Sequence, residues 1–191
     1  MALLRYPAKI TKSYLFKLAI PIFFSNLATP FVGIVDTALM GHLNDIAFLA
    51  ATSIATSVIT MILWSFGFLR MGTVGLVSQL LGKGDYREIV ITLIRYFFLA
   101  VLIGLIIIFF KNNILNLIYN FYNPKDLTKI LVDKYISIRI LAAPAELLIY
   151  VISGLYLGLQ KTILSSTLIA LFNILNIIFS YYFVVNLNLN I

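Results

Sequence analysis

Five long apolar runs, each with few charges or none, most constrain how this 191-residue chain folds. They lie at about residues 18–40, 47–81, 89–110, 135–159 and 162–186. Each is long enough to cross a hydrocarbon core of about 30 Å as a helix rising about 1.5 Å per residue. No water is available inside that core, so each backbone N–H and C=O must be paired within the chain. We therefore expect an all-α integral membrane protein with five transmembrane helices, in a single domain over residues 1–191.

The composition excludes most soluble alternatives. Hydrophobic residues make up 62% of the chain and charged residues 11%, whereas soluble domains carry about 25% charged residues. A chain of this length has too much surface to hide so large an apolar majority from water. The net charge of +7 does not indicate a nucleic-acid partner, because the basic residues flank the apolar runs as loop charges do. The expected partner is the lipid bilayer.

The loop charges predict the orientation. Seven basic residues precede the first run or lie in the connections after the second and fourth runs: Arg5, Lys9, Lys12, Lys17, Lys83, Arg87 and Lys161. The opposite side holds four, namely Lys111, Lys125, Lys129 and Lys134, partly offset by Asp126 and Asp133. The excess favours a cytoplasmic N-terminus in a multi-pass protein. Within the long connection we expect a short interfacial helix at about 114–121 and a turn at Asn123-Pro124.

The chain offers little for enzyme chemistry. It has no cysteine and a single histidine, His42, so disulfides, thiolate chemistry and a metal site are not expected. A lipid-handling transferase is an alternative from another class. It would call for several histidines or acidic residues at one interface, and the sequence shows no such cluster. We therefore expect no enzyme.

Asp36 is the candidate for proton or cation coupling. It lies in an otherwise apolar run, where a carboxylate costs several kcal/mol unless it is paired, hydrated or protonated. A low dielectric favours the neutral form, which makes proton exchange near neutral pH possible. The structural alternative is a buried aspartate held by neighbouring hydroxyls, or one that reaches the interface. Pro30, six residues earlier, is a candidate hinge, with a static kink as its alternative.

The fifth run offers polar partners for Asp36. Asn173, Asn176 and Ser180 follow one another at i, i+3 and i+7 and so share one helix face. If the first and fifth runs both point outward, Asn176 and Ser180 lie near the depth of Asp36. Tyr135, at the start of the fourth run, reaches the same level. Ordinary hydrogen bonding between helices is the alternative for these residues.

Further charged and small residues occur in the runs. Arg70 is expected to extend its stem toward the inner interface. Arg139 and Glu146 share a face but, seven residues apart, are expected to be too distant for a direct pair with relaxed side chains. Glycines that would allow close helix contact are Gly33, Gly41, Gly67, Gly72 and Gly75.

Several ordered segments resemble the N-terminal half of multidrug and toxic compound extrusion (MATE) transporters, in particular the DinF-like branch. The match covers nearly the whole chain, and so many segments in order make it specific. The segments are Ala19-Ile20-Pro21, Gly33-Ile34-Val35-Asp36-Thr37-Ala38-Leu39-Met40-Gly41, Gly67-Phe68-Leu69-Arg70-Met71-Gly72-Thr73, Gly75-Leu76-Val77-Ser78-Gln79, Ile138-Arg139-Ile140, Ala143-Pro144-Ala145, Gly158-Leu159-Gln160 and Asn173-Ile174-Leu175-Asn176-Ile177.

The resemblance implies a secondary antiporter of two six-helix lobes in the bacterial inner (plasma) membrane. Such a protein exports cationic or amphipathic drugs or metabolites in exchange for H⁺ or Na⁺ by alternating access, with no cofactor beyond the coupling ion. The five helices correspond to most of the N-terminal lobe. The family's helix-one carboxylate matches Asp36, its helix-five asparagine matches Asn176, and Tyr135 aligns with a tyrosine of the same network.

The chain departs from the family pattern in three respects. Ser180 stands where many DinF-like members have a second carboxylate, and Glu146 stands where the family has a small or apolar residue. A sixth helix and the second lobe have no counterpart in the sequence. We therefore expect a truncated or split reading frame, with a separately encoded C-terminal half as a candidate partner, and no transport by this chain alone. The alternative is a non-transporting remnant of a transporter gene.

Overall fold

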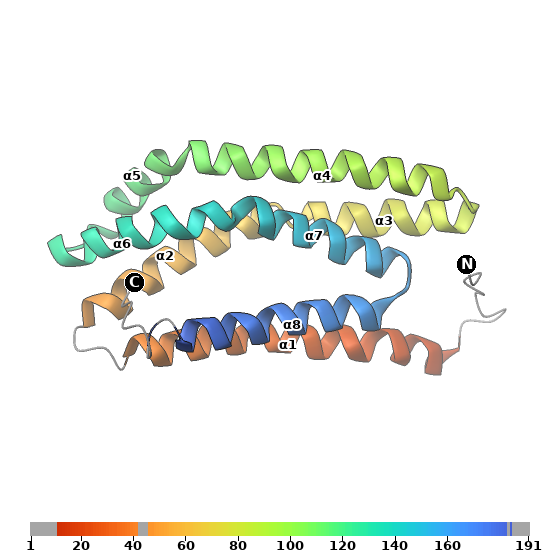
Figure 1. Ribbon diagram of the computed structural model, residues 1–191, viewed down its shortest axis with the longest axis horizontal. Helices are drawn as coiled ribbons and strands as arrows, with labels where there is room; N and C mark the ends of the chain where they lie inside the picture. The colour runs from red at the N-terminus through yellow and green to blue at the C-terminus, as the bar shows by residue number, and fades with distance from the viewer. Residues whose placement is uncertain (1–10, 42–45, 183, 185–191) are drawn as a thin grey trace.

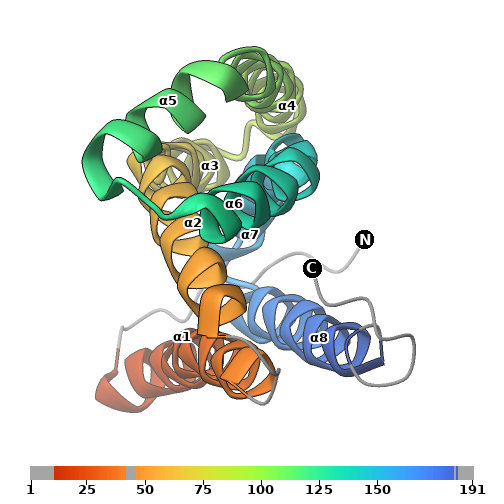
Figure 2. The same ribbon diagram turned by 90° about the vertical axis from the view of Figure 1, so that its left-hand side faces the viewer.

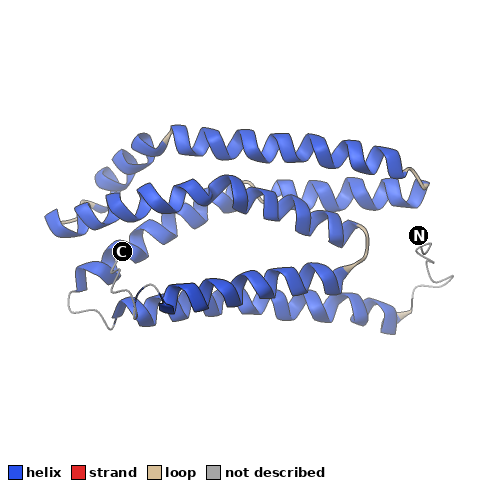
Figure 3. Ribbon diagram, viewed as in Figure 1, coloured by secondary structure: helices blue, strands red, loops and turns tan. Residues whose placement is uncertain are grey.

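The computed structural model describes residues 11–41, 46–182 and 184, apart from the side chains at 25, 26 and 28–30. This part of the chain is helical, with no strand (Figure 3). The elements are α1 (Lys12–Gly41), α2 (Ile46–Ser65), α3 (Phe68–Lys83), α4 (Tyr86–Phe109), α5 (Lys111–Tyr122), α6 (Asp126–Arg139), the 3-10 turn η1 (Ile140–Ala142), α7 (Ala143–Gly158) and α8 (Thr162–Tyr181).

The all-α membrane architecture expected from the sequence is confirmed. Four helical stretches of the described residues are long and apolar enough to cross a membrane: 46–83, 86–109, 126–158 and 162–181. The first expected run lies in α1, a helix of 30 residues. Among the described residues, its apolar part is Phe31–Gly41, which is shorter than the four stretches above. Positions 183, 185 and 186 of the last expected run lie outside the described residues. A count of five spans is therefore approximate.

The helices divide into a bundle and a pair. In Figure 1, α2, α3, α4, α6 and α7 run together, whereas α1 and α8 lie side by side along one flank. Figure 2 shows α5 lying obliquely across one end of the bundle. The start of α1, the α3–α4 turn and the α7–α8 turn are at one end of the molecule (Figure 1). The side chains of Tyr14 and Gln160 meet at that end, with the Tyr14 hydroxyl donating to Oε1 at 2.6 Å.

The bundle holds most of the buried side chains. One apolar cluster joins α2, α3, α4, α5, α6 and α7, with fully buried members such as Leu69, Ile136 and Leu147. A second cluster around Val77 and Ile89 closes the end next to the α3–α4 turn. Side chains from several helices interdigitate here, so this region has a defined core although its outer faces are apolar as well.

Glycines bring the bundle helices close together, mostly at positions that the sequence analysis did not name. A Cβ on Gly154 would lie 2.8 Å from the Arg70 carbonyl oxygen, and one on Gly104 would lie 2.5 Å from Pro144 Cα. Gly158, four residues after Gly154, meets Val77 at 2.8 Å in the same way, so α7 presents a small-xxx-small face to α3.

The five glycines named from the sequence behave differently. Among the described residues nothing lies within 4 Å of a Cβ at Gly33, Gly41 or Gly75, so the close contact that these glycines would allow is not made there. Gly72 faces the Tyr96 hydroxyl at 2.8 Å, and Gly67 has only the Trp64 carbonyl oxygen of its own turn at 3.1 Å. Glycine content alone does not reveal which helix face meets a neighbour.

Two of the expected runs are interrupted. The run at 47–81 consists of α2 and α3, separated at Phe66 and Gly67, where i→i−3 bonds such as Gly67 N to Trp64 O (2.9 Å) replace the regular ladder. The fourth run passes through η1, and Pro144 opens α7 at a position where a missing N–H costs little. Both breaks lie inside apolar runs, where hydropathy alone gives no boundary.

The connection between the third and fourth runs is more helical than expected. A helix, α5, is present where the interfacial helix was expected at 114–121, and the turn follows at Asn123, which has a left-handed backbone (φ 42°). α6, however, begins at Asp126, nine residues before the predicted start at Tyr135. Its first turns bury Leu131 and Val132 while Asp133 stays exposed. This amphipathic pattern hides the helix from a search for apolar runs.

The α3–α4 turn is fixed by glycine and an N-cap. Gly84 has φ 74° and its N–H donates to the Leu81 carbonyl at 3.0 Å, which ends α3. The Asp85 side chain then accepts from the Glu88 N–H at 3.0 Å and starts α4. The α3–α4 turn is thus built from local capping.

Candidate functional site

Asp36 lies on the helix pair, five residues before the end of α1. Its carboxylate is half-buried, and it accepts a hydrogen bond from the side chain of Ser180 on α8. Ser180 is the residue that stands where a second carboxylate was expected from the family pattern. A serine hydroxyl can donate to an ionised carboxylate or accept from a protonated one, so it suits either state of Asp36.

Arg139 provides a positive charge that interacts with the Asp36 carboxylate. It ends α6 and interacts electrostatically with the Asp36 carboxylate across the space between the bundle and the helix pair. Its guanidinium also forms an ion pair with Glu146 on α7. One arginine therefore faces two carboxylates that belong to different helices.

The ion pair corrects an expectation from the sequence. Arg139 and Glu146 were expected to be too far apart, because seven residues of straight α-helix span about 10.5 Å. The chain between them instead passes through η1, and side chains on helices lean toward the N-terminal end, so Glu146 leans back toward Arg139. Both are long side chains, and they meet with 37% and 28% of their side-chain surface exposed.

Tyr135 belongs to the same cluster. Its hydroxyl is 3.2 Å from Thr56 Oγ1 on α2, and it hydrogen-bonds to Arg139 one turn later on its own helix. Arg139 therefore interacts with both Tyr135 and Glu146. No direct contact between Tyr135 and Asp36 occurs among the described residues, so the link between them passes through the guanidinium.

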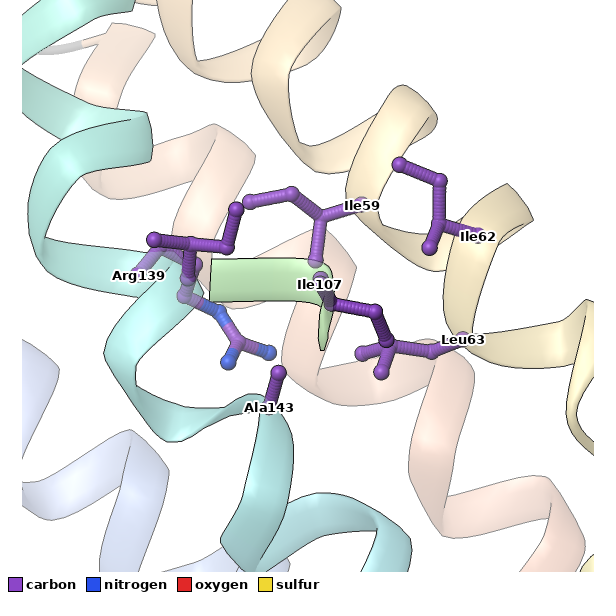
Figure 4. A pocket seen from close by; sticks show the side chains of 7 residues that line it. Ile59, Ile62, Leu63, Ile107, Arg139 and Ala143 are labelled. Atoms are coloured by element: carbon purple, nitrogen blue, oxygen red, sulfur yellow. The ribbon is translucent and has the colours of Figure 1, made fainter. Parts of the chain in front are cut away.

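The stem of Arg139 lines a small apolar pocket (Figure 4). The void is about 10 Å³, space for one water molecule at most. Figure 4 shows the guanidinium directed toward Ala143 at the start of α7. The pocket is lined by Ile59, Ile62 and Leu63 of α2, Ile107 of α4, and Arg139, Ile140 and Ala143. This apolar packing fixes the arginine stem while its charged head stays with Glu146.

The remaining predicted residues are less closely gathered. Asn176, one turn before Ser180 on α8, is exposed, and Asn173 is half-buried. The contact of Asp36 that the structure shows is with Ser180 and not with Asn176. Pro30 lies within α1, which is helical on both sides of it, but its side chain is outside the described residues.

The charges of this cluster are unbalanced. Asp36 and Glu146 carry two negative charges when ionised, and Arg139 carries one positive charge. A proton or a monovalent cation bound at Asp36 would make the group neutral, which a low-dielectric environment favours. The arrangement can therefore hold one exchangeable cation while the Arg139–Glu146 pair stays intact.

The sequence did not mark one member of the cluster, Thr56, and did not predict one contact. Thr56 lies in an apolar run and carries no charge. Arg139 and Glu146 were placed on one helix face but were expected to be too far apart for a direct pair. Their i, i+7 spacing across a Pro-containing junction was the available signal, since opposite charges on one face of a membrane helix seldom remain unpaired.

Comparisons with known proteins agree with this architecture. A family model described as MatE matches residues 21–182. Over 177 residues the chain is 31% identical to the DNA damage-inducible protein F of Escherichia coli (strain K12), a match that covers 93% of this chain.

A solved structure shows the same fold. A MOP superfamily transporter from Pyrococcus furiosus superposes with a TM-score of 0.81 at 19% identity, over 89% of this chain. The match covers 37% of that transporter, and the match to the Escherichia coli protein covers 39% of its length. The chain thus spans about two fifths of the length of these relatives.

Proposed function

This chain belongs to the MatE family of membrane transporters, and we propose that it forms most of the N-terminal lobe of a secondary antiporter that exports cationic or amphipathic organic compounds in exchange for H⁺ or Na⁺. Because the chain spans about two fifths of its relatives, the proposed transport is that of an assembly in which a second lobe completes the pathway. Two halves that rock about a central site are what alternating access requires.

The contacts of Asp36 support this proposal most directly. An intramembrane carboxylate that meets a hydroxyl on Ser180 and senses Arg139 is a suitable place for a coupling ion, because binding one cation removes the excess negative charge. Asp36 also lies at the junction of the helix pair and the bundle. A change of charge there can alter how the two regions attract each other, which couples ion binding to movement.

Transport by cells without their own efflux pumps tests the proposal. The chain is expressed together with a segment that covers the remaining length of a relative, and efflux of a fluorescent organic cation is measured with and without a protonophore or external Na⁺. We expect ion-dependent efflux that Asp36→Asn abolishes. Asp133→Asn, an exposed acidic position on α6, is the matched control and should transport normally. Unchanged efflux in the Asp36→Asn variant would contradict the assignment.

We further propose that the N-terminus is cytoplasmic in an inner membrane. The start of α1, the α3–α4 turn and the α7–α8 turn share one end of the fold (Figure 1). Five basic residues of the larger group lie on the helix ends and turns there, namely Lys12, Lys17, Lys83, Arg87 and Lys161, whereas Arg5 and Lys9 lie outside the described residues. The chain has no cysteine, so single cysteines can be introduced without background.

Cysteine labelling of intact cells tests this orientation. Asn120→Cys on α5 should react with an impermeant maleimide from outside, whereas Lys83→Cys should react only after permeabilisation. Both positions are exposed, so accessibility within the protein does not bias the comparison. Residue 44, in the loop between α1 and α2, lies outside the described residues, and Asn44→Cys is expected to follow Asn120→Cys. The opposite labelling pattern would reverse the orientation.

A further inference from the structure

A cavity separate from the Asp36 cluster opens beside Arg70. Its volume is about 700 Å³, within the range of about 300–1,000 Å³ typical of small-molecule sites. The walls come from the end of α2, from α3 and from α7. They are formed by Trp64, Gly67, Arg70, Met71, Val74, Gly75, Tyr150 and Leu157.

Arg70 gives this cavity a positive charge in the first turn of α3, well inside the apolar stretch 46–83. It precedes Lys83, at the end of α3, by thirteen residues, which is about 20 Å of helix. The guanidinium makes no ion pair or side-chain hydrogen bond with any of the described residues. A charge at such depth is costly unless water or an anion meets it, and the cavity is the space from which either can reach it.

The neighbouring carboxylate does not neutralise Arg70. Tyr150, on the cavity wall, interacts electrostatically with both Arg70 and Glu146. Glu146, however, is already engaged by Arg139. Tyr150 therefore neighbours both a carboxylate that is already paired and an arginine whose charge remains available to a ligand.

The rest of the lining suits the apolar part of a ligand. Trp64 and Met71 are 76% and 78% exposed, and together with Val74 and Leu157 they offer aromatic and aliphatic surface beside the charge. The guanidinium fork binds planar or tetrahedral oxyanions through two N–H donors, and the Tyr150 hydroxyl can donate a further hydrogen bond.

We propose that this cavity binds an amphipathic organic anion, with its carboxylate, sulfonate or phosphate on Arg70 and Tyr150 and its apolar body against Trp64 and Met71. The same chemistry is offered by a soluble organic acid and by the headgroup of an acidic lipid. The proposal goes beyond the proposed antiport, because the site has the opposite polarity to Asp36 and its occupancy can be measured without transport.

Trp64 provides a reporter at the site, since it is the one tryptophan of the chain. The purified full chain is placed in zwitterionic phosphatidylcholine nanodiscs, and energy transfer from Trp64 to a dansyl group is measured. Dansylglycine carries a carboxylate, and dansylcadaverine carries an ammonium on the same fluorophore. We expect saturable transfer to dansylglycine, at least tenfold weaker for dansylcadaverine, and displacement by octanesulfonate.

Substitutions distinguish an effect of the Arg70 charge on binding from a loss of folded structure. Arg70→Gln should weaken dansylglycine binding at least tenfold, Arg70→Lys should weaken it less, and Tyr150→Phe should weaken it a few-fold. Arg87→Gln removes the same charge from an exposed position at the start of α4 and should bind normally. Unchanged circular dichroism in each variant shows that the helices persist. Equal binding by Arg70→Gln and Arg87→Gln, or equal affinity for the two dansyl probes, would overturn the proposal.

Nanodisc composition identifies the source of the anion. If acidic phosphatidylglycerol weakens dansylglycine binding to the parent chain but not the residual binding to Arg70→Gln, a lipid headgroup occupies the site. If phosphatidylglycerol has no effect, the site takes a soluble organic acid. Either result supports an anion site at Arg70, and neither depends on whether the assembly transports.

Discussion

The bundle of α2, α3, α4, α6 and α7 and the pair of α1 and α8 are both apolar, yet they are packed very differently. Of the 18 most apolar consecutive residues, 33% are buried in the stretch formed by α2 and α3 and also in that formed by α6 and α7. In α8 the corresponding share is 11%. On α1 only Met40 is buried among the hydrophobic residues described. The bundle has a core, and the pair is held mainly by its own two helices.

The difference shows where stability and function reside. Lipid tails are about as apolar as leucine, so exposed apolar faces on α1 and α8 cost little in a membrane. The tightly packed glycines, Gly104, Gly154 and Gly158, all lie in the bundle. Asp36 and Ser180 lie in the pair. The region to which we assign the exchangeable charge is thus the region with the fewest buried side chains among the described residues.

Adding a methyl group to each region should give the largest contrast. Gly104→Ala places a Cβ 2.5 Å from the backbone of Pro144, and we expect it to lower the free energy of unfolding by about 1–3 kcal/mol. Gly33→Ala on α1 meets nothing within 4 Å and should be neutral, or stabilising by about 0.5–1 kcal/mol, because alanine is the better helix former. SDS titration followed by circular dichroism measures both. Equal losses would mean that the pair is packed as tightly as the bundle.

The ion pair should show a smaller effect. A double-mutant cycle of Arg139→Gln and Glu146→Gln is expected to give a coupling energy of about 1 kcal/mol, because the side chains are partly exposed. Each single variant leaves one charge without its partner and should be less stable than the double variant. The same SDS titration applies. Additive single effects would show that the pair does not connect α6 to α7 energetically.

Ser180→Ala tests the contact inside the helix pair. Loss of the hydroxyl next to Asp36 should reduce ion-coupled efflux roughly three- to tenfold, or about 0.6–1.4 kcal/mol, without changing the thermal stability of the bundle. Ser57→Ala is the control, since Ser57 is exposed and its hydroxyl donates to the Ser53 carbonyl of its own helix. A drop in stability with unchanged efflux would make Ser180 structural.

Tyr135→Phe should give the smallest effect. It removes the hydroxyl that meets Thr56 at 3.2 Å, and hydrogen bonds between membrane helices contribute about 0.6 kcal/mol on average. Tyr181→Phe, at an exposed position on α8, should change the free energy of unfolding by less than that. A loss well above 1.7 kcal/mol for Tyr135→Phe would exceed the usual range for such bonds and place Tyr135 among the main supports of Arg139.

The sequence predicts where the helices lie better than it predicts how they pack against one another. Apolar runs predict the approximate spans because a backbone in hydrocarbon must be helical. Asp36 is easily recognised as a candidate because a charge in an apolar run is energetically costly. The start of α6 at Asp126 was missed because its exposed charges lower the local hydropathy. The close contact of Gly104 with Pro144 and the Arg139–Glu146 pair depend on how helices rotate and where η1 bends the chain. Those properties emerge only from tertiary packing.

The pairing of the first helix with the last has a consequence for biosynthesis. α1 packs chiefly against α8, and roughly 120 residues of chain lie between the end of one and the start of the other. At about 5–20 residues per second, a ribosome needs roughly 6 to 24 s to make that stretch. During this interval α1 has entered the bilayer without its main neighbour, so the insertion machinery must accept a helix whose acidic residue has not yet met its hydroxyl partner. The contact between Asp36 and Ser180, which forms the proposed ion site, can therefore be made only after the helices of the bundle have been synthesised.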